Sequence, residues 1–267
     1  ALPIFVDISI NKMSLAVREV SVAKGYDPRD FALVASGGAG PLHVCAIARE
    51  LYIPTVIVPL FPSHFSALGM LLADERHDFT RTVYSDLAGV NFDALVKVHD
   101  EMVADARESL RYGRDAQYQI QLDIRYVGQE FWLQIPVTEA EIRAGDTDAI
   151  ERRFAEIHDR RFGHAALDEP LELVNLRLTA VGARPKIEFP KLARGGADAR
   201  VGTRDIHLDD AARPVSCAVY RREKLGSGAE VRGPAVIEEY ASTTVLFDGD
   251  VARVADTGEL IVTVRGG

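Results

Sequence analysis

A glycine-rich turn lies where a predicted strand meets a predicted helix, and residues 36–41 read SGGAGP. Glycines at such a junction permit positive φ angles, and they let a ligand reach the backbone because they carry no side chain. The N-terminus of the following helix presents unpaired N–H groups and a partial positive charge, which suit an anion such as a phosphate. Gly37, Gly38, Ala39 and Gly40 therefore form a candidate nucleotide-binding turn. The alternative is that they form only a tight turn.

Three histidines fall in patterns that could bring acid–base or ligand chemistry to a site. His43 lies in the first turn of the helix after the glycines, where it either faces a ligand or caps and packs locally. Its spacing leaves both readings open. His64 follows in a later loop, where an ordinary exposed histidine is the commoner case. His158 shares a helical pattern with Phe154 and Ile157, which favours a packed or partner-facing histidine over a catalytic one.

Two acidic clusters and one oppositely charged pair have residue types that could do chemistry. Residues 74–78 offer carboxylates and a histidine, which are metal-ligand types, but a solvated charged turn after a helix explains them better. Glu238 and Glu239 could act as an acid–base pair, although a surface pair at a strand end is the usual arrangement. Asp123 and Arg125 share one face of a predicted strand and could form an ion pair. The sequence assigns no catalytic residue and no metal ligand.

Composition excludes several classes of protein. The 267 residues carry a net charge of −9. Because binding to a nucleic-acid backbone requires clustered lysine and arginine, a nucleic-acid-binding protein is not expected. No apolar run reaches the roughly 18 residues that indicate a membrane-spanning helix. The first residues lack the pattern of a signal peptide. The two cysteines, Cys45 and Cys217, lie far apart in unrelated patterns, so we expect a reduced, cytoplasmic protein.

The elements that would position the glycine turn form an α/β segment over residues 1–76. Apolar residues at helical spacing predict a helix over 13–23. Residues 31–35 read as a strand that is apolar on both faces, which is typical of a buried parallel strand. A helix from Pro41 to about Leu51, a strand over 55–58 and a short helix over 66–73 complete the segment.

The remaining chain divides into two further segments. Residues 77–185 form a predicted α+β accessory region, and residues 186–267 form a predicted β-rich region that begins with an irregular connection to about residue 210. The accessory region contains an amphipathic helix over 92–110, strands over 120–126, 131–137 and 172–184, and a helix with Asp148 at its N-cap. The strands of the last region are 215–220, 235–239, 243–247, 251–254 and 260–264.

Five blocks in order along the chain resemble the hydantoinase A/5-oxoprolinase (HyuA-like) family. They are DPRDFALVASGGAGPLH, IPTVIVPLFPSHFSALGMLLAD, LDIRYVGQEFWLQIPV, HDRRFGHAALDEPLELVNLRL and GPAVIEEYASTTVLFDGD. They are spread over nearly all of the chain, so the resemblance is specific. The family covers ATP-dependent hydantoinases, 5-oxoprolinases and subunits of acetone and acetophenone carboxylases. Its RYVGQ block makes Arg125, Tyr126 and Gln129 candidates for substrate or interface contacts, with a structural role as the alternative; Trp132 is expected in a core or an interface.

The resemblance implies part of the second lobe of an actin/Hsp70-like ATPase fold, in which two α/β lobes close over ATP and a metal ion. A glycine pair after a strand of that lobe contacts the adenosine and a nearby phosphate, and Gly37, Gly38, Ala39 and Gly40 match that element, with His43 beside it. The family reaction phosphorylates an amide or ketone oxygen with ATP, and the product is then hydrolysed or carboxylated. ATP and Mg²⁺ are the implied cofactors, and a cyclic amide or a ketone is the implied substrate.

The sequence lacks the DxGGTxTD phosphate loop that family members carry in their first lobe. We therefore expect the C-terminal segment of a hydantoinase/5-oxoprolinase-type subunit, whose partners are the first lobe of the same subunit and a HyuB-like partner subunit. Alone, the chain is expected neither to bind nucleotide tightly nor to hydrolyse ATP. The alternative is a non-catalytic assembly module that binds the HyuB-like partner and in which the glycine turn is only a turn. The sequence does not identify the substrate.

Overall fold

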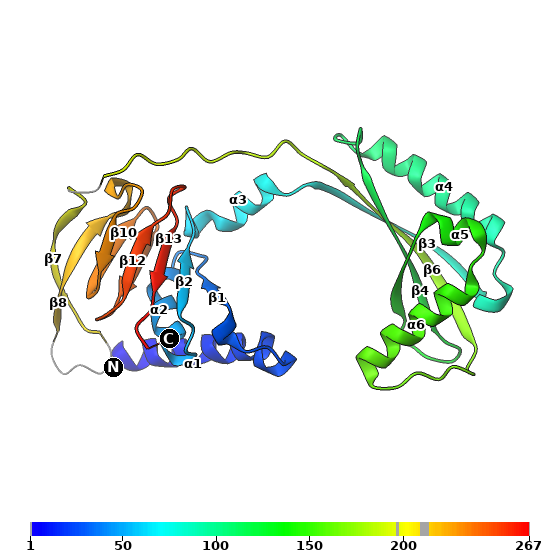
Figure 1. Ribbon diagram of the computed structural model, residues 1–267, viewed down its shortest axis with the longest axis horizontal. Coiled ribbons are helices and arrows are strands. Elements are labelled where there is room, and N and C mark those ends of the chain that lie inside the picture. Colours follow the sequence, from blue (N-terminus) through cyan, green and yellow to red (C-terminus); the bar gives the residue numbers. More distant parts are fainter. Residues whose placement is uncertain (1, 196–197, 209–213, 267) are drawn as a thin grey trace. The chain divides into compact units, whose positions relative to one another are not determined.

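The computed structural model describes residues 2–195, 198–208 and 214–266, and the chain divides into two compact units (Figure 1). Unit 1 contains Ala1–Leu71 and Ile187–Gly267, and unit 2 is the continuous stretch Leu72–Lys186. The two ends of the chain, which the sequence suggested as separate segments, thus lie in one unit. Strand pairing is the reason, because the last strand of the chain hydrogen-bonds to a strand of the first segment.

The first sheet of unit 1 has five strands in the order β1-β2-β13-β12-β9. They are β1 (Ala32–Val34), β2 (Thr55–Val58), β9 (Glu230–Arg232), β12 (Val251–Val254) and β13 (Leu260–Thr263). β1 and β2 are parallel, and the other neighbours are antiparallel. The predicted parallel direction of β1 is confirmed, but its predicted burial is wrong: β1 is an edge strand of this sheet, and its Val34 is 49% exposed.

The second sheet of unit 1 has four strands in the order β11-β10-β8-β7. They are β7 (Arg200–Ile206), β8 (Val215–Arg221), β10 (Ala235–Glu239) and β11 (Ser242–Leu246). β7 lies in the stretch expected to be an irregular connection. Its residues are almost all exposed, so no apolar alternation marked it as a strand, and pairing with β8 decides its conformation. One hydrophobic core takes side chains from both sheets, among them Val56, Val262, Ile237 and Leu246.

The described residues of unit 1 form three α-helices: α1 (Leu2–Val20), α2 (Gly40–Glu50) and α3 (Phe65–Leu72), the last of which ends at the unit boundary. α2 connects β1 to β2 and buries Val44, Cys45 and Ala48 in the core. α3 is apolar apart from Ser66, yet it buries no residue. Within the described part of the chain, no helix is long and apolar enough to cross a membrane.

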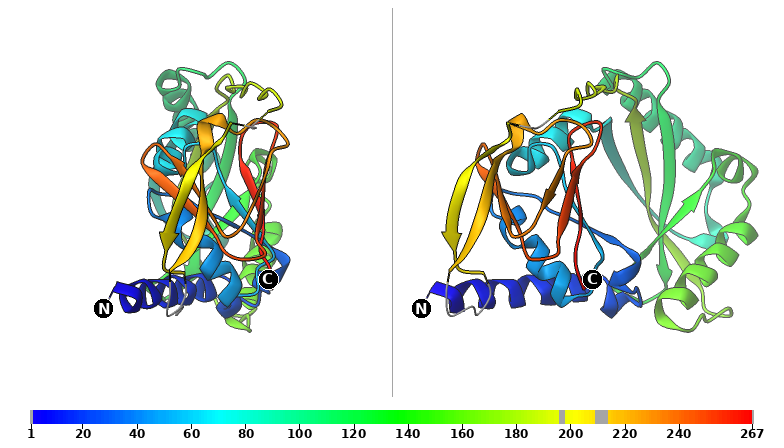
Figure 2. Two further views of the ribbon diagram at one scale, coloured as in Figure 1. Left: turned by 90° about the vertical axis from the view of Figure 1, so that its left-hand side faces the viewer. Right: turned by 60° about the vertical axis from the view of Figure 1, so that its left-hand side comes forward.

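Unit 2 is an antiparallel sheet that carries three helices on one side (Figure 2). Its strand order is β3-β6-β4-β5, with β3 (Glu75–Asp86), β4 (Gln117–Tyr126), β5 (Leu133–Val137) and β6 (Leu171–Gly182). The helices are α4 (Phe92–Ser109), α5 (Glu139–Ala144) and α6 (Thr147–Phe162). Alternate residues of β4 and β5 enter the core, as the sequence alternation predicts, and α6 starts after Asp146 rather than Asp148.

On the face of this sheet that does not pack against the helices, polar side chains of neighbouring strands form hydrogen bonds with one another. Asp123 is fully buried and accepts hydrogen bonds from Arg177 Nε at 2.8 Å and from Asn175 Nδ2 at 2.7 Å. Arg125 donates to Glu172 at 2.6 Å. The suggested pair between Asp123 and Arg125 does not form, because the neighbouring strand β6 places a partner for each directly across the ladder.

Residues 75–78 are the first residues of strand β3, and Asp74 precedes them, so the expected charged turn does not form. Asp74 accepts from Lys186 Nζ at 2.6 Å, Glu75 accepts from the backbone N–H of Tyr112 at 2.9 Å, and Asp78 accepts from Thr179 Oγ1 at 2.5 Å. Successive side chains of a strand point to opposite faces of the sheet. These carboxylates are therefore bound to different partners and do not converge on one point.

A capping box fixes the start of α5. The backbone N–H of Glu141 donates to Thr138 Oγ1 at 3.2 Å, and the Glu141 carboxylate accepts from the backbone N–H of Thr138 at 2.7 Å. Hydrogen bonds from Arg153 and Thr138 lower the pKa of Glu141 to about 2. The ionised carboxylate therefore stabilises the folded state above pH 4.5, and this contribution is lost as the pH falls toward 2.

We expect Glu141→Gln to lower the free energy of unfolding at pH 7 by about 1 kcal/mol, which is typical of a lost helix cap. The difference from wild type should shrink as the pH is lowered through the same window, because the wild-type carboxylate then becomes neutral as well. Urea denaturation as a function of pH measures both values. Glu151→Gln, at an exposed position of α6, is the control. An equal deficit at both ends of the pH range would contradict the role of the carboxylate charge.

Candidate functional site

The glycine turn joins the end of β1 to the start of α2, as the sequence predicted. Gly37 has a φ of +84°, and its N–H donates to the carbonyl oxygen of Pro62 at 2.7 Å. A Cβ added at Gly37 would meet nothing within 4 Å. This positive φ favours glycine, or a residue such as asparagine that tolerates the left-handed conformation, and the space beside the Cα of Gly37 is open to a ligand.

At position 38, lack of space rather than backbone conformation favours glycine. A Cβ at this position would lie 3.0 Å from the carbonyl oxygen of Ala241, which is closer than ordinary contact. Ala241 lies in the hairpin between β10 and β11 and has a positive φ of +58°. A Cβ at Gly40 would only make ordinary contact with Ala35, at 3.7 Å. The fold itself thus accounts for Gly38, whereas the open side of the turn lies at Gly37.

The start of α2 has no side-chain cap. Ala39 is the N-cap residue, and no side chain accepts a hydrogen bond from the first turn of the helix there. Pro41 lacks an N–H, so it removes one of the donors that the first turn would otherwise leave unpaired. α2 has 11 residues, enough to present a partial positive charge at its N-terminus. The turn and the helix start together resemble the arrangement that binds phosphate groups.

His43 does not join the glycines on their open side. It lines a separate pocket of about 380 Å³ between α1, α2 and the second sheet, together with Ile10, Val245 and Phe247. Partial burial lowers the pKa of His43. The structure therefore brings Gly37 to Gly40 together in one turn, and it places His43 against apolar side chains one helical turn away.

A larger pocket of about 1100 Å³ lies beside the turn on the side of Ala241. His64 and Tyr240 stack at a centroid distance of 6.1 Å and are both lining residues. Phe61, another lining residue, has a positive φ of +54°, which is uncommon for an aromatic side chain. The apolar lining residues are Leu60, Phe61, Ala67, Leu68, Leu71, Leu192, Leu225, Ala241, Val254 and Leu260.

A buried ion pair forms the polar wall of this pocket. Arg222 Nη1 lies 2.8 Å from Glu239 Oε1, and the two side chains are only 7% and 11% exposed. Arg222 Nη2 also donates to the carbonyl oxygens of Val58, Pro59 and Gly258 at 3.0–3.1 Å. Burial raises the pKa of Glu239 and lowers the pKa of Arg222, while their mutual attraction opposes both shifts. Arg222 thus ties β10 to the loop that follows β2.

Sequence reasoning missed Arg222 and placed Glu239 in a surface pair. Glu238 pairs with the exposed Arg204 at 2.8 Å, whereas Glu239 pairs with the buried Arg222; the two glutamate side chains are 17% and 11% exposed. Arg222 stands in the run RREK, which gives no sign of which arginine is buried. Its carbonyl partners are 36 to 164 residues away along the chain, so local pattern could not identify it.

Two of the candidates in the RYVGQ block have structural roles. Arg125 pairs with Glu172, and the Tyr126 hydroxyl accepts a hydrogen bond from the N–H of Ala166 at 2.7 Å. Tyr126 also packs against the buried His158, whose ring centroid is 5.0 Å away. Gln129 lines a pocket of about 540 Å³ near two exposed aromatic residues, Phe131 (80%) and Trp132 (42%). Trp132 is therefore not a core residue of unit 2.

Comparison with known proteins adds a family context. Residues 4–79 match the sequence model described as Hydantoinase/oxoprolinase, and residues 82–261 match the one described as Hydantoinase/oxoprolinase C-terminal domain. The chain is 34% identical over 88% of its length to an uncharacterized protein of Methanocaldococcus jannaschii. It is 30% identical over 88% of its length to caprolactamase subunit alpha of Pseudomonas jessenii. It covers 33% and 35% of these proteins, so it spans about a third of the curated relatives it matches.

Solved structures share the fold. The nucleotide-free structure of acetone carboxylase matches 97% of this chain and 39% of its own chain, with a TM-score of 0.77 at 24% identity. The crystal structure of ATP-dependent caprolactamase from Pseudomonas jessenii matches 97% of this chain and 39% of its own, with a TM-score of 0.72 at 26% identity. The arrangement of several sheets and helices is therefore common to all three.

Proposed function

Because this chain belongs to the hydantoinase/oxoprolinase family, we propose that it is the C-terminal segment of an ATP-dependent hydantoinase or 5-oxoprolinase-type subunit. The complete subunit hydrolyses a cyclic amide, or supports carboxylation of a ketone, through a phosphorylated intermediate. This segment supplies one wall of the nucleotide cleft and contacts to a HyuB-like partner. The named relatives include subunits of caprolactamase, acetone carboxylase and acetophenone carboxylase, which supports a multisubunit setting.

The glycine turn is the observation that carries the proposal. A parallel strand, an open turn at Gly37 and an uncapped helix start meet at the carboxyl end of β1, and open α/β sheets bind ligands at that end of their strands. The backbone of Gly37 to Gly40 fits the adenosine side and a nearby phosphate of ATP in an actin-like lobe. Residues 36–43 contain no carboxylate, so Mg²⁺ would be held elsewhere in the complete subunit.

The chemistry explains why an amide-cleaving enzyme of this type uses ATP. A neutral amide oxygen is a poor leaving group. Transfer of the γ-phosphoryl group of ATP to that oxygen, with release of ADP, lets the oxygen leave as phosphate after water attacks the carbon. In such an enzyme, binding and orientation account for most of the work done by the protein, because little covalent chemistry is left to its side chains. The role of the glycine turn is to hold the nucleotide in a fixed position at the connection between β1 and α2.

Gly37→Asn tests the proposal directly. Asparagine tolerates a positive φ, and the added atoms meet open space in this chain, so the fold is expected to survive. In the complete subunit, the side chain would occupy the space of the bound nucleotide. We expect the Kd for MgATP, measured by calorimetry, to rise at least about tenfold, or roughly 1.4 kcal/mol. Gly25→Asn is the matched control, since Gly25 has a φ of +83° and is equally open.

If Gly37→Asn binds MgATP as tightly as wild type, the turn is structural and the alternative function stands. That alternative is an assembly module that binds the HyuB-like partner. Exposed aromatic residues of unit 2 favour it, since aromatic side chains are enriched in protein interfaces: Phe131 is 80%, Phe162 53% and Trp132 42% exposed. Retained partner association in a chain with no nucleotide affinity would identify this second function.

A further inference from the structure

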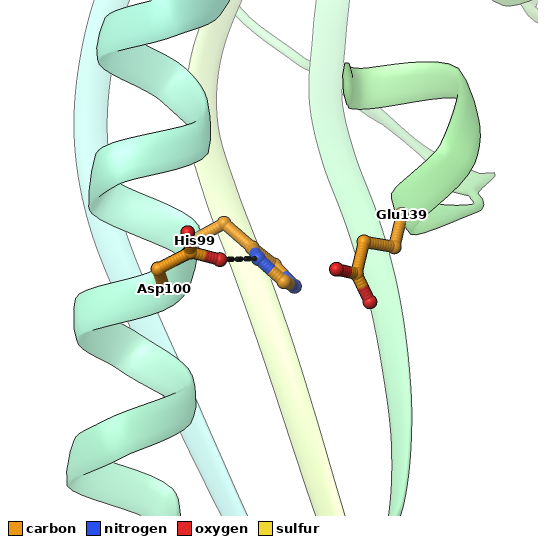
Figure 3. Close-up of side chains that lie close together, drawn as sticks. All are labelled: His99, Asp100 and Glu139. Atoms are coloured by element: carbon orange, nitrogen blue, oxygen red, sulfur yellow. Dashed lines mark hydrogen bonds and ion pairs between the residues drawn. The ribbon is translucent and has the colours of Figure 1, made fainter. Parts of the chain in front are cut away.

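Three side chains of unit 2 gather at the start of α5, apart from the glycine turn. His99 and Asp100 come from α4, and Glu139 is the first residue of α5. One potential ligand atom of each lies within 4.8 Å of those of the other two. Figure 3 shows the His99 ring between the two carboxylates. They line a pocket of about 720 Å³, which leaves room for water or a small ligand.

The hydrogen bond between His99 and Asp100 fixes the imidazole. Nδ1 of His99 lies 3.0 Å from Asp100 Oδ1, and the His99 side chain is 5% exposed. When Nδ1 carries the proton that it donates to Asp100, the other ring nitrogen, Nε2, has a free lone pair. Nε2 lies at the end of the ring that faces Glu139 (Figure 3), and within the described residues it makes no hydrogen bond. Histidines that bind metals are commonly oriented by a carboxylate in this way.

Glu139 is held in place independently of the histidine. The Thr138–Glu141 capping box fixes the first turn of α5, on which Glu139 lies. Arg143 Nε donates to Glu139 at 2.7 Å, and Arg143 Nη2 donates to Asp100 at 2.7 Å. The guanidinium thus serves as the counter-ion that keeps two carboxylates beside one imidazole. Its side chain is 45% exposed, so it can turn to solvent when another cation takes this role.

We propose that this cluster binds a divalent transition-metal ion, with Zn²⁺ as the reference ion. His99 Nε2 and the Glu139 carboxylate coordinate the ion, Asp100 orients the imidazole, and water from the pocket completes the coordination. An imidazole with carboxylate oxygens and no thiolate selects ions such as Zn²⁺ or Co²⁺ over Mg²⁺ and Ca²⁺, which prefer all-oxygen sites. The site lies wholly in unit 2 and does not depend on the proposed nucleotide function.

Titration of the untagged chain with Zn²⁺ by calorimetry, and with Co²⁺ by visible absorption, tests the site. One equivalent is expected to bind with a Kd below about 100 μM, corresponding to roughly −5.5 kcal/mol. Glu139→Gln, a surface change, should weaken binding at least about tenfold, and Asp100→Asn should weaken it about 10–100-fold through the imidazole. Arg143→Gln should tighten binding, because it removes the competing cation.

The matched control is His77→Gln. His77 also pairs with a carboxylate in unit 2, Glu75 at 3.3 Å, but no second carboxylate completes a cluster there among the described residues. His99→Gln should abolish binding, with circular dichroism confirming that the buried substitution leaves the fold intact. The proposal is overturned if wild type shows neither Zn²⁺ heat nor Co²⁺ ligand-field bands at these concentrations. It is equally overturned if Glu139→Gln binds as wild type does.

Discussion

Arg222→Met is expected to lower the free energy of unfolding by about 3–5 kcal/mol, the range observed when one partner of a buried ion pair is removed. The change leaves Glu239 buried without its cation, and it leaves three carbonyl groups without their donor. Two of those carbonyls belong to Val58 and Pro59, which lead into the loop whose Pro62 accepts the Gly37 hydrogen bond. The substitution should therefore also loosen the glycine turn.

The neighbouring arginine provides the control for this experiment. Arg221 is 46% exposed and pairs with Glu238 at 3.5 Å, so Arg221→Met should change the free energy by less than about 1 kcal/mol. Urea denaturation gives both values, and amide hydrogen exchange at Gly37 reports the turn. The double variant Arg222→Met with Glu239→Gln should recover part of the loss, because no uncompensated charge is then buried. Equal costs for Arg221→Met and Arg222→Met would refute the special role of Arg222.

Asp250→Ala is expected to cost a similar amount, about 3–5 kcal/mol. Asp250 is fully buried, and its carboxylate accepts from the backbone N–H of Phe247 at 2.9 Å and from that of Arg265 at 3.1 Å. It also pairs with Arg49 of α2 at 2.7 Å. One carboxylate thus joins the β11–β12 turn, the end of the chain after β13, and the helix that follows the glycine turn. Alanine would leave the two backbone N–H groups without this acceptor, and it would remove the carboxylate that pairs with Arg49, whose Nη2 would keep only the carbonyl oxygen of Asp248 at 2.8 Å.

Asp248→Ala separates this role from a general effect of removing charge. Asp248 is 82% exposed and reaches Arg265 at 3.2 Å, so its loss should change the free energy by no more than about 0.5 kcal/mol. Chemical denaturation at pH 7 measures both variants. A cost for Asp250→Ala close to that of Asp248→Ala would show that the buried hydrogen bonds are replaced by water. A large difference would establish Asp250 as an anchor of unit 1.

The sequence alone determined the elements whose signals are local. The glycine turn, the parallel direction of β1, and the strand over 55–58 follow from short-range chemistry. The amphipathic helix α4 is predictable because apolar residues recur about every 3.6 residues when one face of a helix is buried. The alternation in β4 and β5 is predictable because apolar residues recur every second residue when one face of a strand is buried. The blocks that resemble the hydantoinase/oxoprolinase family identified the family for the same reason, because each is read from consecutive residues.

Only the tertiary structure decided which distant parts meet. β13 pairs with β2 across about two hundred residues, which joins both ends of the chain in unit 1. β3 forms because β6 pairs with it along its length, although residues 74–78 read as a solvated charged turn in the sequence. His43 faces an apolar pocket, and Arg222 reaches Glu239, because packing between sheets sets the direction of each side chain. The physical reason is that a contact between residues far apart leaves no period in either segment, so its partners appear only when the chain is folded.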